Sequence, residues 1–390
     1  MALPVPLYFT FVTNILSAEK RLVAAGFVWF AMMGLAVTMS GPLSVSLGPA
    51  FRQPQANESQ IVTALFAGSA LMIALSVSFA KLFARTWVAR FCGFSYATGM
   101  ILCWMSPSWT LLLLGFGLIG LGNGGMSIWY NAEFARFFDG KRVGAWLSAL
   151  NGFWAVGAVS GPLLLRQFER DPRAALGIVA CIAVVALPLA VMVPTRVDPE
   201  HSEAEESVPV PRLIFGLMVL LGLYVGAETA TLTLMSRHMM SVHAMSWSLA
   251  TAVGSGLWFA FMVGRFGAGP IAARLHPSRL LFGCATLACV SLCIAAQPGL
   301  AMPGYIMLGL AMGPIFPTVI AWGTGLSPAA HRLTGIMVMG PCVTAVTFPG
   351  MVTALVGVQF AIMPWIIIGV HATIGVLALV WAPRSSPARG

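Results

Sequence analysis

The chain has 390 residues, of which 58% are hydrophobic and only 8% are charged, and its mean hydropathy is +0.89. Because soluble domains are usually about one quarter charged, this composition excludes a soluble globular protein, a disordered chain and a disulfide-stabilised scaffold. The net charge of +9 comes from 21 basic and 12 acidic residues in short gaps between apolar runs, so lipid headgroups are the expected acidic partner, rather than nucleic acid.

Apolar runs dominate the chain from one end to the other. A membrane-spanning helix needs about 20 mainly apolar residues, and twelve runs meet this requirement. In chain order they are 22–46, 60–83, 87–105, 109–136, 144–166, 173–194, 212–236, 246–267, 279–297, 299–325, 332–357 and 359–382. We therefore expect an all-α membrane protein with twelve transmembrane helices.

The basic residues orient these spans. Cytoplasmic loops of membrane proteins carry an excess of Lys and Arg. If both termini are cytoplasmic, most of the 21 basic residues lie on the inner side. The outer side then keeps only Arg52, Arg166, Arg170, Arg173 and Arg237. We expect a multi-pass protein of the cell inner membrane with both termini in the cytoplasm.

A polar segment divides the twelve spans into two sets of six. It is the charged cytoplasmic linker 195–211, which separates an N-terminal bundle, 1–194, from a C-terminal bundle, 212–390. Glycine-rich stretches in spans four and ten suggest that the two six-helix bundles are pseudo-symmetric. This layout is typical of a transporter. The alternative is a twelve-helix membrane enzyme or channel, but no catalytic motif is present, so we expect no enzyme.

Two acidic residues lie well inside the spans, and such residues are functional candidates by default. Glu228 in span seven has Tyr224 four residues before it and Thr231 three residues after it, on one helix face. This face can accept hydrogen bonds from the hydroxyl groups of a polar solute. Removal from water favours the protonated carboxyl group, so Glu228 is also the expected coupling residue. The alternative is a structural carboxylate at a broken helix.

Amide and aromatic residues of spans four and five are the other candidates for substrate binding. Asn123, Ser127 and Asn131 are four residues apart and form one polar stripe, and Asn151 and Trp154 lie in the next span. Amides offer both the donors and the acceptors that the hydroxyl groups of a polar solute need. Interhelical hydrogen bonding explains the stripe equally well.

Charged residues near the span ends are expected to control gating. Glu133 lies close to Arg136, and an ion pair there would stabilise one transport state. Arg265 and Arg274 are expected to latch helix ends at inner loops rather than to contact substrate.

Histidines and cysteines give no metal-binding pattern in the sequence. His238 and His243 flank an outer loop. Metal binding is one alternative there, and an ordinary surface role is the expectation that we adopt. His371 is alone in span twelve and is expected to be a satisfied packing residue.

The stretch Gly264-Arg265-Phe266, followed by Arg274 and Arg279, resembles a conserved inner-loop motif of the major facilitator superfamily. Twelve spans and a central linker fit the same family. The resemblance covers essentially the whole chain. It implies a secondary transporter that works by alternating access between the two bundles.

Three segments resemble the fucose/glucose–cation symporter branch of that superfamily. They are Tyr224-Val-Gly-Ala-Glu228 in span seven, the stretch 309–317 in span ten, and Gly120-Leu-Gly-Asn-Gly with Asn131 in span four. This resemblance implies import of a hexose with H⁺ or Na⁺ as coupling ion and no other cofactor. The chain departs from the branch at Ser127, where the branch usually has an acidic residue.

Two competing functions remain open. Gly157-Ala-Val-Ser-Gly161-Pro162 resembles the antiporter motif of the superfamily, which would imply a proton-coupled exporter of drugs or metabolites. The missing acid at Ser127 favours an uncoupled facilitator. In each case the expected partners are a small-molecule substrate and the lipid bilayer, with no nucleic acid, and the expected state is a monomer.

Overall fold

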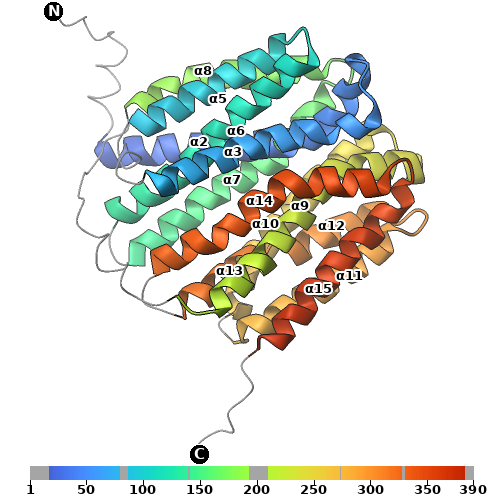
Figure 1. The fold of residues 1–390 in the computed structure, drawn as a ribbon. Coiled ribbons are helices and arrows are strands. Elements are labelled where there is room, and N and C mark those ends of the chain that lie inside the picture. The colour runs from blue at the N-terminus through green and yellow to red at the C-terminus, as the bar shows by residue number, and fades with distance from the viewer. Residues whose placement is uncertain are drawn as a thin grey trace, which may run out of the picture. The chain divides into compact units, whose positions relative to one another are not determined.

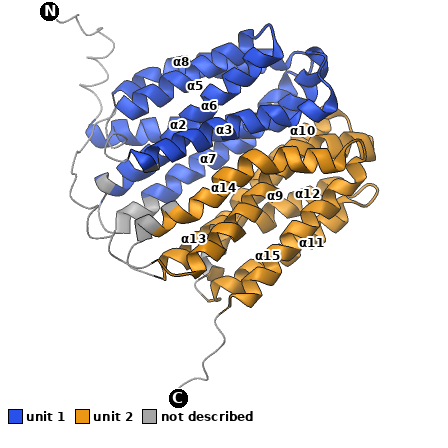
Figure 2. Cartoon of the chain, viewed as in Figure 1, with its two compact units in different colours: residues 1–200 blue, residues 201–390 orange. Residues whose placement is uncertain are grey.

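The structure is a computed structural model that describes residues 17–79, 87–138, 141–192, 210–272, 274–326 and 330–382. These residues are almost entirely helical and contain no strand. The chain forms two compact units, Met1–Glu200 and His201–Gly390, each of which is described by itself (Figures 1 and 2). Most of the expected linker lies outside the described residues.

The described residues of unit 1 form six long helices. They are α2 (Ala18–Ala50), α3 (Ser59–Ser78), α5 (Trp87–Met105), α6 (Trp109–Phe137), α7 (Lys141–Gln167) and α8 (Pro172–Val191). A short 3-10 turn, Gln55–Asn57, precedes α3. Side chains cap two of these helices, since Ser17 Oγ accepts from the N–H of Lys20 and Ser108 Oγ from the N–H of Leu111.

Seven α-helices are found in the part of unit 2 that the structure describes. They are α9 (Leu213–His243), α10 (Trp247–Ala272), α11 (Pro277–Ala295), α12 (Ala301–Met312), α13 (Ile315–Thr324), α14 (Ala330–Val356) and α15 (Met363–Val380). Another 3-10 turn, Phe360–Ile362, leads into α15. The span expected over 299–325 is thus two helices that are separated at Gly313 and Pro314. Proline has no N–H to continue the ladder, so a break at this point follows from the sequence.

The all-helical membrane architecture is confirmed. Eleven helices or helix pairs among the described residues are long and apolar enough to cross a membrane, with α12 and α13 counted together. The remaining expected span, 87–105, is the helix α5, which is not among these eleven. Arg90 near the start of α5 lowers the mean hydropathy of that helix.

The two units repeat one pattern of helix pairing. In unit 1, α2 packs on α7, α3 on α6, and α5 on both α6 and α8. In unit 2, α9 packs on α14, α10 on α12, and α11 on both α12 and α15. If α12 and α13 are counted as one span, each pair joins the same positions in the order of six. The internal symmetry suggested by the glycine-rich stretches therefore has a structural counterpart.

Glycines lie at the same crossings in both units. A Cβ atom on Gly34 or Gly157 would run into the backbone of the facing helix where α2 crosses α7. At the corresponding crossing of α9 with α14, a Cβ on Gly340 would run into the Met218 carbonyl, and the Thr344 hydroxyl donates to the Gly222 carbonyl at 2.7 Å. Small residues let membrane helices approach closely and bond across their backbones.

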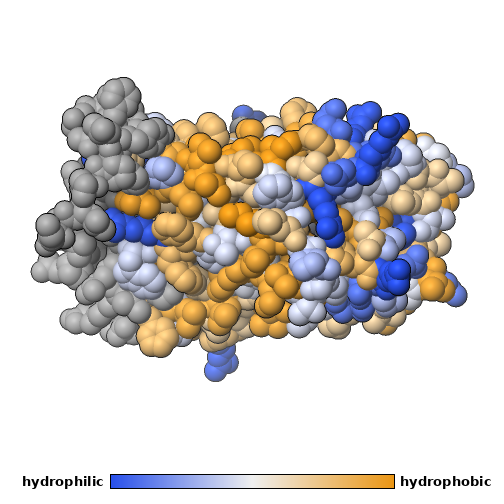
Figure 3. Space-filling model, turned by 90° about the horizontal axis from the view of Figure 1, so that it is seen from above, coloured by the Kyte–Doolittle hydropathy of each residue, from blue (hydrophilic) through white to orange (hydrophobic). Residues whose placement is uncertain are grey.

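Hydrophobic side chains cover the outside of the helices. Large apolar residues are exposed along the spans, for example Leu71, Phe94 and Val185, the last of which is 73% exposed. Figure 3 shows hydrophobic side chains over much of the middle of the face in view, with hydrophilic side chains toward one end. Exposed apolar area on this scale fits contact with lipid rather than with water.

We predict that Gly157→Ala destabilises unit 1. The added methyl group would meet the Ala31 backbone and push α2 away from α7, an overpacking that costs about 1–3 kcal/mol. Thermal unfolding of the purified protein in detergent measures the effect. Gly117→Ala is the matched control, because its Cβ would have no neighbour nearer than the Ala64 carbonyl at 3.9 Å. Equal unfolding temperatures for the two variants would contradict the prediction.

Candidate functional site

The candidate site in unit 2 begins on α9, a 31-residue helix without proline. Tyr224 and Glu228 lie one turn apart on the same face of this helix. The Tyr224 side chain is fully buried, and Glu228 keeps partial access to solvent. The two polar groups interact with each other. The Tyr224 hydroxyl nevertheless makes no hydrogen bond of good geometry among the described residues, so the contact between them is loose.

Arg265 of α10 brings a positive charge to this face. Its guanidinium group is close enough to act electrostatically on both Glu228 and Tyr224. The same group lies over the Phe261 ring, 4.7 Å from its centroid, and its Nε donates to the Gly313 carbonyl at 3.4 Å. Arg265 therefore links the acid of α9 to the segment between α12 and α13.

The Gly313 carbonyl needs this donor for a reason that is visible in the sequence. In an α-helix it would accept from the N–H four residues later, but that residue is Pro317, which has no N–H. An unpaired carbonyl inside a membrane costs several kcal/mol. A Cβ atom on Gly313 would run into the Phe261 carbonyl, so glycine is also required for the close approach of α10.

These groups together offer hydrogen-bond acceptors, donors and a protonatable carboxyl group in one place. A carboxylate accepts hydrogen bonds, a guanidinium donates them, and a phenol does both. Such a set can bind a polar solute or a proton. It contains no nucleophile and base arranged for catalysis.

The structure places Arg265 farther from a helix end than expected. It was expected near the end of a span, as a latch at an inner loop, but α10 continues to Ala272. Arg274 is exposed in the turn after α10. The hydroxyl of Thr231 donates to the Ala227 carbonyl of its own helix at 2.8 Å, so it does not join the site. The gating roles of Arg265 and Arg274 stay predictions.

The polar stripe of unit 1 lies on α6. Asn123 is buried and its Oδ1 has no hydrogen-bond partner among the described residues. Ser127 and Asn131 are partly exposed, and the Asn131 side-chain amide donates to the Ser127 carbonyl at 2.7 Å. Part of the hydrogen-bonding capacity of Asn131 is thus used within its own helix, while the acceptor of Asn123 stays available.

The other predicted residues of unit 1 lie on α6 and α7. Asn151 donates its side-chain amide to the Leu147 carbonyl of its own helix at 2.8 Å. Trp154 is partly exposed, and its backbone carbonyl is the atom that a Cβ on Gly34 would meet. Glu133 is buried in α6 at 1% exposure. The Arg136 side chain, its expected partner, lies outside the described residues.

Aromatic residues of unit 1 that the sequence gave little reason to select also present unpaired polar atoms. Trp29 Nε1, Trp129 Nε1 and the Tyr130 hydroxyl are buried without a hydrogen-bond partner among the described residues. The Trp29 and Tyr96 rings pack edge to face at 5.7 Å. Membrane aromatic residues are common at the interfaces, so sequence alone does not separate an interior tryptophan from an anchor.

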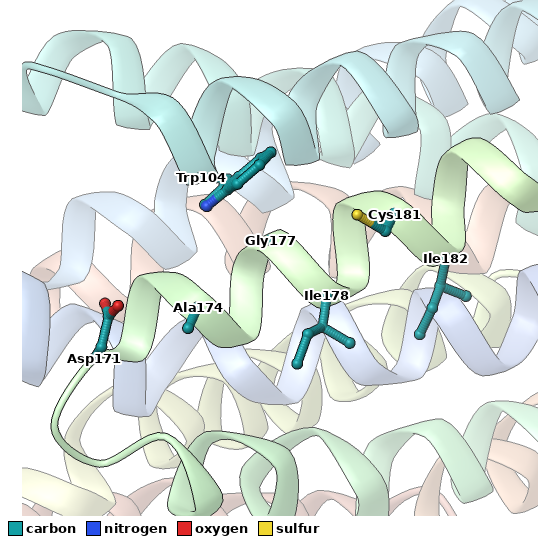
Figure 4. A pocket seen from close by; sticks show the side chains of 7 residues that line it. All are labelled: Trp104, Asp171, Ala174, Gly177, Ile178, Cys181 and Ile182. Carbon is teal, nitrogen blue, oxygen red and sulfur yellow. The ribbon is translucent and has the colours of Figure 1, made fainter.

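Two surface grooves lie outside these clusters. One groove, of about 460 Å³, is in unit 1 between α5 and α8, and Figure 4 shows Trp104 over the backbone of Gly177 with Ile178 and Ile182 beside it. Asp171 is its only ionisable lining residue apart from the Cys181 thiol. Its apolar, exposed lining fits contact with lipid chains. The second, in unit 2, is lined in part by His276, Trp322 and Trp381.

Comparison with known sequences shows the family of the chain. The sequence profile of the Major Facilitator Superfamily matches residues 21–351 of the chain. The chain belongs to this superfamily. Its members are membrane transporters and not enzymes, so the protein is a multi-pass secondary transporter. A search of curated proteins finds no significant match.

Solved structures of this superfamily share the fold. The D-xylose–proton symporter has a TM-score of 0.75 at 13% identity, over 94% of this chain and 98% of that one. The nucleoside transporter NupG has a TM-score of 0.72 at 12% identity, over 94% and 98%. The fucose:proton symporter FucP of E. coli has a TM-score of 0.63 at 19% identity, over 92% and 98%. At these identities the likeness concerns the fold alone.

We predict that Glu228 and Arg265 are energetically coupled. Removing one charge leaves the other without its partner in the bundle, so Glu228→Gln and Arg265→Gln should each destabilise the transporter, and the double variant should lose less than the sum. The expected coupling is roughly 0.5–3 kcal/mol. Denaturant unfolding of the four proteins in detergent gives this value. The control combines Glu228→Gln with Arg274→Gln, for which the losses of unfolding free energy in the single variants should add up in the double variant. If the losses for Glu228→Gln and Arg265→Gln also add up, the coupling is refuted.

Proposed function

We propose that this transporter moves a small polar solute of the sugar type across the inner membrane by alternating access, coupled to H⁺ or Na⁺. The observation that carries the proposal is the gathering of Tyr224, Glu228 and Arg265 in unit 2, next to the break between α12 and α13. An acid inside a transmembrane bundle is expensive and usually has a function. Its neighbours supply what a polyhydroxylated solute requires.

The resemblance to the fucose/glucose–cation symporter branch supports the sugar assignment. The span-seven stretch that contains Tyr224 and Glu228 carries that resemblance, and so does the span-ten stretch that ends at Pro317. Two of the similar solved structures are named as proton symporters of xylose and of fucose, and a third is a nucleoside transporter. All three names describe solutes with several hydroxyl groups.

A coupling mechanism follows from the position of Arg265. While Glu228 is charged, it competes with the Gly313 carbonyl for the same guanidinium group. When Glu228 takes up a proton, Arg265 is free to bind that carbonyl more strongly. The charge of one carboxyl group is thereby transmitted to the flexible join between α12 and α13. A helix break of this kind is a natural hinge for alternating access.

Unit 1 supplies the other half of the proposed machinery. We assign the polar stripe Asn123, Ser127 and Asn131, with Asn151 and Trp154, to contact with the solute. Glu133 with Arg136, and Arg274 at the end of α10, are assigned to gating. In this proposal both termini are cytoplasmic, the segments 1–194 and 212–390 are the moving bundles, and the transporter acts as a monomer.

Two alternatives are distinguishable by coupling. A proton-coupled exporter would lower the sensitivity of cells to drugs or metabolites when it is expressed. An uncoupled facilitator would equilibrate its solute and never concentrate it. Ser127 favours the facilitator, because the acid usual in the symporter branch is missing there. Glu228 favours a coupled transporter, because a second acid is available in unit 2.

We predict that proteoliposomes containing the protein concentrate one sugar when a proton or sodium gradient is imposed. Uptake of a panel of labelled sugars, with and without the gradient, measures this. Accumulation above the outside concentration supports the symporter. Equal sugar concentrations inside and outside, with or without the gradient, indicate an uncoupled facilitator. No sugar flux from correctly folded protein would refute the sugar assignment and favour the exporter.

We predict that Glu228→Gln abolishes gradient-driven accumulation while exchange of solute across the membrane continues. The amide keeps the size and hydrogen-bonding capacity of the side chain but cannot carry a proton. Uptake and counterflow assays in proteoliposomes separate the two activities. Glu169→Gln is the control, because Glu169 is exposed in the turn between α7 and α8. Wild-type accumulation by the Glu228 variant would exclude its coupling role.

A further inference from the structure

A cluster of polar side chains lies at the C-terminal end of α9, away from Glu228. His238 is fully buried there and His243 ends the helix, and their rings lie 5.0 Å apart. Tyr305 near the start of α12 and Met363 at the start of α15 complete the cluster. The expectation of an ordinary surface role was wrong for His238, because α9 continues to His243 and carries His238 within the packed part of unit 2.

The Tyr305 hydroxyl connects His238 to Met363. Its oxygen lies 3.0 Å from Nδ1 of His238 and 3.6 Å from the Met363 sulfur. A hydroxyl has one proton, so two arrangements exist. When that proton goes to the sulfur, Nδ1–H of His238 donates to the Tyr305 oxygen and Nε2 is a bare acceptor; when it goes to Nδ1, the ring proton is on Nε2.

The two ring nitrogens of His243 also differ in their partners. Its ring donates to the backbone carbonyl of Ala295 at the end of α11. Its Nε2 is buried and has no partner among the described residues, so the donor is Nδ1. His238 Nε2 is likewise buried and unpaired. Two adjacent imidazoles therefore each have a buried Nε2 without a partner in the described part of the chain, which is costly.

We propose that His238 and His243 bind one divalent transition-metal ion of the zinc or copper type through their Nε2 atoms. Imidazole nitrogen is a preferred ligand of these ions. Metal-binding histidines almost always donate their other ring N–H to a carbonyl or a similar acceptor, and the Ala295 backbone at His243 and the Tyr305 oxygen at His238 are placed for this. If each Nε2 points at one ion at about 2.0–2.1 Å, the ring separation of 5.0 Å corresponds to an N–metal–N angle near the tetrahedral value.

The site has two protein ligands, and water completes the coordination. Among the described residues no group of three or more His, Cys, Asp or Glu side chains could hold a metal. His243 is partly exposed at the end of α9, so the site lies near the surface of unit 2 although both Nε2 atoms are buried. A closed structural zinc site has four protein ligands. This site is therefore open and exchangeable, and it would tie the end of α9 to α11 and α12 when it is occupied.

His371 provides an internal comparison. It is also fully buried, its Nδ1 bonds to the Ile367 carbonyl at 3.0 Å, and its Nε2 has no partner among the described residues. No second imidazole is paired with it in the described structure. Like His238 it is a buried histidine with a bonded Nδ1 and an unpartnered Nε2, but it lacks a neighbouring imidazole ligand, so it should not bind the ion.

The test is Cu²⁺ binding by the purified full-length protein in detergent, followed by electron paramagnetic resonance, with Zn²⁺ as competitor. The exposed thiols of Cys181 and Cys293 are alkylated beforehand to remove competing ligands. We expect one Cu²⁺ with two nitrogen ligands. His238→Gln and His243→Gln should each weaken binding at least about tenfold, and His371→Gln should leave it unchanged.

A second variant keeps the proposal testable if a histidine variant does not fold. Tyr305→Phe removes only the hydroxyl that holds His238 Nδ1, so Cu²⁺ should keep two nitrogen ligands but bind roughly 10–100-fold more weakly. Equal affinity in all variants, or a spectrum without nitrogen ligands, would overturn the proposal. In that case the two imidazoles are bridged by water. Neither result depends on whether the protein transports a sugar.

Discussion

Every polar group inside a membrane must find its partner within the protein, and the interior of unit 2 depends on this constraint. Pro317 removes the N–H that the Gly313 carbonyl would use, and Arg265 Nε donates to that carbonyl instead. The partly exposed Arg265 side chain also lies close enough to Glu228 to act on it electrostatically. The break in span ten, the arginine and the acid are therefore one arrangement, and a change in any of them affects the other two.

The same constraint explains why glycine is placed where helices cross. Without a hydrophobic driving force between helices in lipid, association relies on close packing and on bonds between backbones. Gly34 and Gly157 permit this in unit 1, and Gly222 and Gly340 permit it at the corresponding crossing in unit 2. In both units the glycines lie where the first span crosses the fifth, as expected for two halves that share one order of helices.

The histidine pair at the end of α9 meets the same constraint in another way, because its proposed partner is a metal ion and not a protein group. Tyr305 and the Ala295 carbonyl satisfy one nitrogen of each ring, and they also fix both rings in place. The remaining nitrogens are oriented but unpaired. In Glu228 and Arg265 the protein supplies both halves of the interaction, whereas here it supplies one half and leaves the other to a bound ion.

The sequence by itself determined the all-helical membrane fold and the number and order of its spans, because span length and hydropathy depend on local composition. It also marked Tyr224 and Glu228, because acids are rare in apolar spans. Only the tertiary structure decided that α9 continues to His243, that Arg265 of α10 contacts Gly313, that the Thr231 hydroxyl is used within its own helix, and that His238 lies beside His243. Those features depend on which helix packs against which. Hydropathy reports how apolar a helix is, but not which face it presents to its neighbour.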